Sequence, residues 1–80
     1  MTVGEAVRER ILELCKERSL PINKLCSISG VTQSTVNNII SGRNNSATIQ
    51  TVARICKGLD ISLHTFFDTD LFRNLEQEIR

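Results

Sequence analysis

Residues 32–41 carry the side chains with the clearest chemical potential in this chain. The stretch reads TQSTVNNIIS and contains neither an acid nor a base. On a helix with about 100° between successive residues, Val36, Ile39 and Ile40 fall on one side. The other side carries amides and hydroxyls, with Ser34, Asn37, Asn38 and Ser41 at its centre and Gln33 and Thr35 beside them.

An exposed helix face built from amides and hydroxyls needs an explanation. Asn, Ser and Thr are weaker helix formers than Glu, Lys and Arg, which also form stabilising pairs along a helix. Base edges in the major groove of DNA offer one reason, because Gln or Asn forms paired hydrogen bonds with adenine and Ser or Thr bonds several bases. The pattern therefore predicts a helix that reads base edges. A merely polar surface helix is the other interpretation.

The charges are distributed unevenly although the formal net charge is only +1. No Asp or Glu occurs over residues 19–59, whereas four basic residues do, so this segment carries +4. Residues 1–18 are balanced, and residues 60–80 carry −3. A middle segment without acids is typical of a face that meets a polyanion. Chance clustering of a few charges is the alternative.

Length and composition exclude several classes of protein. Eighty residues with 40% hydrophobic residues suit one small domain without a deep substrate cavity. No signal-peptide pattern or apolar run of membrane-spanning length is present, so we expect a cytoplasmic protein that does not enter the membrane. The three cysteines lack metal-site spacing and are expected to be buried thiols. No metal or cofactor is predicted.

Apolar residues recur with helical periodicity and without strand alternation, which predicts an all-α fold. The expected helices cover residues 4–18, 22–29, 32–41 and 48–57, a short segment from residue 62, and a further short segment over 71–79. Thr32, Thr48 and Ser62 are suited to N-capping. Three glycines are expected to end the second, third and fourth helices: Gly30, Gly42 and Gly58. Among the apolar residues expected to pack inward are Ile28, Ile49 and Leu63.

The second and third helices, joined by a short turn at Gly30, outline a helix-turn-helix over residues 22–41. Residues 4–68 resemble the helix-turn-helix family of Cro and the phage repressors, often called the XRE family. The resemblance rests on an ordered set of segments: ILELCKERSL at 11–20, KLCSISGV at 24–31, TQSTVNNIISGR at 32–43, and TIQTVARICKGLDISL at 48–63. It implies a compact five-helix domain over residues 1–68 and a short amphipathic tail over 69–80.

The resemblance implies roles for individual residues. The positions that usually contact bases are Gln33, Ser34 and Asn38, with Asn37 at a position that contacts flanking bases or phosphate. The backbone contacts implied are Thr32, Thr35, Arg43, Asn44, Asn45 and Thr48, the last through its N–H at a helix N-terminus.

The chain departs from the family pattern at two places. Ile22 occupies a position where a Gln often contacts phosphate, so only its backbone N–H is available there. Cys15 and Ile40 occupy positions where many members pair an Arg with a Glu, and we interpret them as an apolar replacement for that ion pair.

Family members usually dimerise, so that two recognition helices enter successive major grooves. A homodimer contact is therefore expected from an apolar set at the C-terminal end: Leu63, Phe67, Phe72, Leu75 and Ile79. The alternative is that the tail folds back onto its own domain, and a protein partner of the tail is also possible.

The main hypothesis is a sequence-specific regulator that binds double-stranded DNA, of bacterial or phage type, nucleoid-associated when bound and without an effector domain. One alternative is the antitoxin of a toxin–antitoxin pair that represses its own operon. Another is a protein-interaction module that kept the fold without DNA binding. An enzyme is not expected, because the single histidine, His64, has no oxyanion site or cleft implied around it. Binding of single-stranded RNA is not expected either, since it needs exposed aromatic residues.

Overall fold

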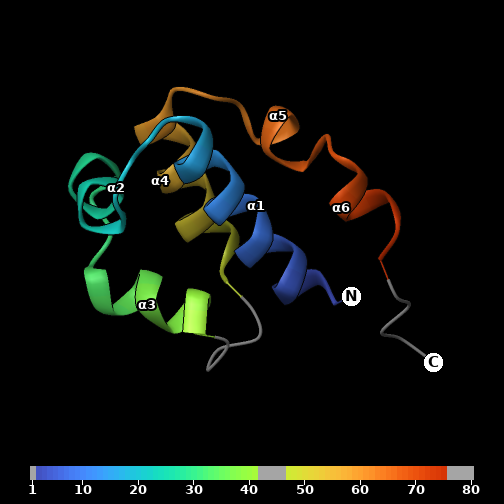
Figure 1. Cartoon of the computed structure of the whole chain (residues 1–80), viewed down its shortest axis with the longest axis horizontal. Helices are drawn as coiled ribbons and strands as arrows, with labels where there is room; N and C mark the ends of the chain where they lie inside the picture. The colour runs from blue at the N-terminus through green and yellow to red at the C-terminus, as the bar shows by residue number, and fades with distance from the viewer. Residues whose placement is uncertain (1, 42–46, 76–80) are drawn as a thin grey trace.

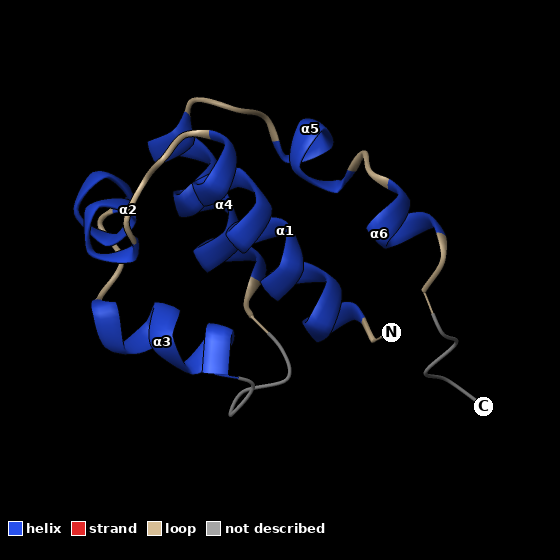
Figure 2. Ribbon diagram, in the orientation of Figure 1, coloured by secondary structure: helices blue, strands red, loops and turns tan. Residues whose placement is uncertain are grey.

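The computed structural model describes residues 2–41 and 47–75, and this part of the chain is helical without strands. Figures 1 and 2 show the arrangement. The helices are α1 (Val3–Glu17), α2 (Ile22–Ser29), α3 (Gln33–Ser41), α4 (Ile49–Leu59), α5 (Leu63–Phe67) and α6 (Asp70–Arg73). The all-α prediction is confirmed.

Hydroxyl side chains cap the helices where the sequence predicts it. The hydroxyls of Thr32, Thr48 and Ser62 each accept a hydrogen bond from the backbone N–H three residues later. An additional cap at Thr2 was not predicted. Its hydroxyl bonds the N–H of Glu5 while the Glu5 carboxylate accepts from the Thr2 N–H, a capping box that lowers the pKa of Glu5.

The core lies where α1, α2 and α4 meet, with α3 and α5 closing its two ends (Figure 1). The largest fully buried side chains come from all five of these helices: Ile11, Leu25, Val36, Val52, Ile55 and Phe66. Because each of these five helices contributes to one cluster, the position of α3 depends on packing across the whole domain.

The three cysteines are buried free thiols, as predicted. Burial raises the pKa of Cys15, Cys26 and Cys56. A raised thiol pKa lowers the thiolate fraction at neutral pH, so these side chains behave as small apolar groups.

Three apolar residues that were expected to pack inward are exposed. Ile28 is 42% exposed, Ile49 is 65% exposed and Leu63 is 39% exposed. In α4 the buried stripe consists of Val52, Ile55, Cys56 and Leu59, which rotates Ile49 to the edge. In α2 the small residue Ser29 takes the buried position instead of Ile28, because α4 approaches closely there.

Gly58 does not end α4, and that prediction was wrong. The helix continues to Leu59, and Asp60 takes the left-handed conformation with φ 58°. Gly58 instead lies against α2, where a Cβ atom would be 2.5 Å from Ser29 Oγ, 2.9 Å from Ile28 O and 3.0 Å from Ser29 Cα. The absence of a side chain is what allows α2 and α4 to approach.

Replacing Gly58 with alanine should therefore destabilise the domain, although alanine is the better helix former. The clash with the α2 backbone costs roughly 1–3 kcal/mol and offsets the gain of about 1 kcal/mol in helix propensity. Urea unfolding measures the net loss. Ala53→Gly on the same helix is the reference for propensity alone, and a Gly58→Ala protein more stable than the parent would contradict the packing assignment.

Arg10 is a charged residue of α1 but is only 7% exposed. Its Nε donates to the Phe66 carbonyl at 2.8 Å and its Nη2 to the Thr65 carbonyl at 3.0 Å. Its Nη1 also pairs with Glu13. Arg10 thus caps the C-terminal end of α5 from a different helix.

The described part of the tail, residues 69–75, folds back onto the domain, which is the alternative considered above for the tail. Phe72 packs edge-on against Phe67, with ring centroids 4.8 Å apart, and also lies beside Phe66. Helix α6 begins at Asp70 and ends at Arg73. Within the described residues it is therefore shorter than the helical segment predicted over 71–79. Leu75 is half-buried, and Ile79 lies outside the described residues.

Candidate nucleic-acid interface

The turn between α2 and α3 is fixed by backbone hydrogen bonds. Gly30 adopts a left-handed conformation with φ 68°, which favours glycine. The N–H groups of Gly30 and Val31 both donate to the Cys26 carbonyl, closing α2. Val31 is buried. The turn therefore sets the angle at which α3 leaves α2, as the glycine position predicted.

The start of α3 is fixed by two threonines. The Thr32 hydroxyl accepts from the Thr35 N–H at 3.2 Å, and the two hydroxyl oxygens lie 2.8 Å apart. Within such a pair one hydroxyl donates to the other, and the acceptor keeps its own hydrogen. That remaining hydrogen is available to an anion outside the protein.

The two faces of α3 differ as the sequence predicted. Val36 and Ile39 are buried and Ile40 is half-buried. The outer residues are Gln33, Ser34 and Asn37, all exposed, and Asn38, which is half-buried. The Ser41 hydroxyl donates to the Asn38 carbonyl at 3.3 Å, which leaves the Asn38 amide outside that bond. The outer face thus presents neutral hydrogen-bonding groups.

Thr48 is the N-cap residue of α4 and is exposed. Its hydroxyl accepts from the Thr51 N–H at 3.1 Å and donates to the Thr51 hydroxyl at 3.0 Å. The other expected backbone contacts, Arg43, Asn44 and Asn45, lie outside the described residues.

The N-terminus of α2 has no side-chain cap, because Pro21 precedes it. The Ile22 side chain packs against the core, so at this position only the backbone N–H is available to a ligand. Cys15 is buried and Ile40 packs against the same core, so both positions hold apolar side chains that contact the core.

Three basic residues between positions 19 and 59, the segment without Asp or Glu, form no ion pair among the described residues. Lys24, Arg54 and Lys57 form no ion pair within this part of the chain, whereas Arg8, Arg10 and Arg73 do. Unpaired cations and the absence of carboxylates leave the region around α2, α3 and α4 positive.

No cluster of His, Cys, Asp or Glu suited to a metal ion occurs among residues 2–41 and 47–75. None of the helices in these ranges is long and apolar enough to cross a membrane.

Two helices joined by a tight glycine turn, with a polar outer face on the second, define a helix-turn-helix DNA-binding protein. The sequence pattern of the Cro/C1-type helix-turn-helix DNA-binding domain matches residues 10–70. The chain belongs to this family, as its sequence resemblance indicated, and it is a DNA-binding regulator by that membership.

A solved structure described as the crystal structure of the prophage Lp1 protein 11 is similar to this chain. The two share 39% sequence identity and superimpose with a TM-score of 0.82, over 94% of this chain and 99% of that one. No curated protein matches the chain.

Proposed function

We propose that this protein is a sequence-specific repressor that reads the major groove of double-stranded DNA with α3. The supporting observation is the charge-free polar face of a helix fixed by a glycine turn and a threonine cap. Base contacts are assigned to Gln33, Ser34, Asn37 and Asn38, whose amides and hydroxyls suit base edges. Residues 1–68 form the DNA-binding domain in this proposal, and residues 69–80 form the tail.

Contacts to the DNA backbone accompany these base contacts in the proposal. Thr32 and Thr35 offer the remaining hydroxyl hydrogen of their pair, and Thr48 offers the N-terminus of α4. The uncapped N-terminus of α2 supports an additional phosphate contact through the Ile22 N–H. Arg43, Asn44 and Asn45 follow α3 directly in the sequence and complete the set. Because few of these groups are cationic, the salt dependence of binding should be shallow.

Binding as a homodimer is part of the proposal, with α5 at the contact. Leu63 is exposed and, with His64, Phe67 and Asp68, it lines a shallow surface depression of about 300 Å³. Phe72 is already half-covered by its own domain, so its contribution and that of Leu75 would be at the edge. Ile79 remains a contact expected from the sequence alone.

Leu63→Glu is predicted to abolish the dimer without unfolding the chain, because the side chain is already exposed. Sedimentation velocity should show a monomer at concentrations where the parent sediments as a dimer, and binding to a two-half-site duplex should fall about tenfold or more. Leu12→Glu, at a similarly exposed leucine of α1, is the matched control and should dimerise normally. A parent that is monomeric on DNA would contradict the contact.

Repression is tested with genomic fragments that the purified protein retains. One retained site is placed across a promoter that drives a reporter, and the protein is expressed alongside it. Repression should depend on the site and disappear with Gln33→Ala/Asn38→Ala. Unchanged or increased transcription would contradict a repressor. An antitoxin role would require, in addition, a toxin gene beside the gene for this protein.

A further inference from the structure

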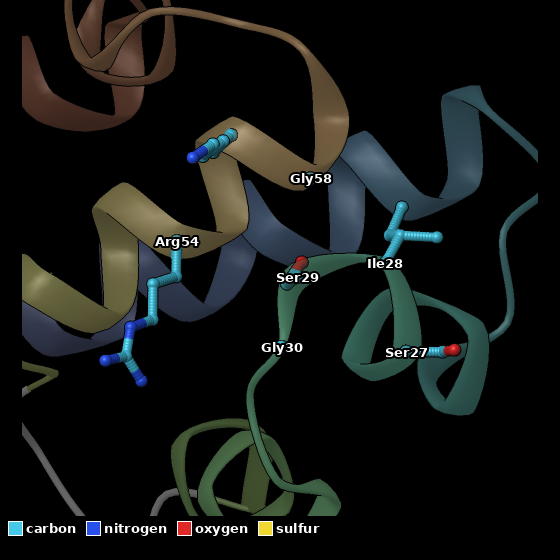
Figure 3. A pocket seen from close by; sticks show the side chains of 7 residues that line it. Ser27, Ile28, Ser29, Gly30, Arg54 and Gly58 are labelled. Atoms are coloured by element: carbon cyan, nitrogen blue, oxygen red, sulfur yellow. The ribbon is translucent and has the colours of Figure 1, made fainter.

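A groove runs between the C-terminal ends of α2 and α4 and has a volume of about 590 Å³. Figure 3 shows it from close by. It is lined by Ser27, Ile28, Ser29, Gly30, Arg54, Lys57 and Gly58. The proposed DNA contacts include none of these residues.

The cations of the groove lie further along α4 than the DNA contact proposed at Thr48. Arg54 and Lys57 follow Thr48 by six and nine residues, which places them about 9 and 13 Å further along the helix. Neither side chain therefore belongs to the α4 N-terminus that is assigned to DNA.

The charge of the groove is positive and uncompensated. Arg54 and Lys57 form no ion pair among the described residues, and no carboxylate lines the groove. The acids Asp68 and Asp70 already pair with Arg73. They also belong to the α5–α6 end of the molecule, opposite α2 (Figure 1). These two acids are therefore not available as occupants of the groove.

The groove also has apolar surface, and a buried polar group lies in its wall. Ile28 is 42% exposed at its edge. The Ser29 hydroxyl is buried without a hydrogen-bond partner, and in Figure 3 its side chain is directed towards α4. Gly58 keeps this wall free of a side chain. An exposed isoleucine on the α2 side of the groove, across from two cations of α4, suits an amphipathic peptide better than a phosphate backbone, which offers no apolar partner.

We propose that this groove docks an acidic amphipathic segment of a partner protein, whose carboxylates pair with Arg54 and Lys57 while an apolar side chain covers Ile28. Such a segment would bind the regulator while it is on DNA, through a surface separate from the DNA-reading face. The groove therefore provides a route by which the bound repressor engages a second protein.

The test uses the ¹⁵N-labelled full chain and a synthetic peptide of about twelve residues with Glu and Leu at helical spacing. Amide resonances of residues 27–30 and 54–58 should shift on titration. Arg54→Glu/Lys57→Glu should raise the dissociation constant about tenfold or more, the loss expected for two exposed ion pairs. Lys16→Glu/Arg18→Glu, which reverses two exposed charges of α1, is the matched control and should bind normally.

Three outcomes would overturn the proposal. The first is the same affinity for a peptide with Gln in place of each Glu. The second is shifts centred on α3 or spread evenly over all exposed cations. The third is that a random-sequence duplex shifts the resonances of the groove residues and competes with the peptide. That result would show that the groove contacts DNA phosphates. The titration needs no operator, so its failure is distinguishable from failure of the repressor assignment.

Discussion

Replacing Arg10 with methionine is expected to lower the free energy of unfolding by about 2–4 kcal/mol. Methionine occupies the space of the arginine stem, but it donates no hydrogen bond. The Phe66 carbonyl then loses the guanidinium bond of 2.8 Å that caps α5, inside a nearly closed part of the domain. Glu13 loses less, because it is about half exposed and water replaces its partner.

Urea unfolding followed by circular dichroism measures this loss. Arg18→Met at the exposed end of α1 is the matched control and should change stability by less than about 0.5 kcal/mol. Arg10→Lys should lie between the parent and Arg10→Met, since an ammonium group keeps the charge but lacks the planar fork that reaches two carbonyls. A stability of Arg10→Met within the range of the control would show that the buried bonds contribute nothing.

The Gln33→Ala/Asn38→Ala protein is expected to lose specific DNA binding while keeping its fold. Each amide that forms paired bonds with a base contributes about 1–3 kcal/mol of discrimination, so the loss of two amides should lower specific affinity by between about thirtyfold and about twenty-thousandfold. Affinity for random duplex should change little, because phosphate contacts supply it. Gln33 is exposed and Asn38 is half-buried at the surface, so neither truncation leaves a hole in the core.

Fluorescence anisotropy with specific and random duplexes gives both affinities at one salt concentration. Asn74→Ala, which removes an exposed amide beyond α6, is the matched control and should bind as the parent does. If the double variant kept the parent's ratio of specific to random affinity, another surface would have to read the bases.

The helices and their caps follow from local sequence, which explains why they were predictable. A hydroxyl three residues before a free N–H, or a glycine at a helix end, acts within one turn of the chain. Thr32, Thr48, Ser62 and Gly30 are of this kind. The polar face of α3 was equally visible, because it depends only on helical periodicity.

The features that were not predicted depend on contacts between distant segments. From sequence alone Gly58 is predicted to end a helix, and only its contact with α2 shows a different role. Ile49 is likewise predicted to be buried, and only the packing of α4 shows that it faces outward. The burial of Arg10 requires the carbonyls of Thr65 and Phe66, more than 50 residues away. One available signal was that Arg10 lies three residues after Val7 and four before Leu14, on the buried side of α1, where a charge needs a partner.

The central claim, that α3 reads DNA sequence for a dimer, is tested most directly by selection from a pool of random duplexes. The parent and Gln33→Ala/Asn38→Ala proteins are run in parallel. The account predicts that the parent enriches a palindrome with half-site centres about 34 Å apart, or roughly 10 base pairs, and that the double variant does not. No enrichment by the parent at low salt would contradict it and favour a protein-interaction module with this fold.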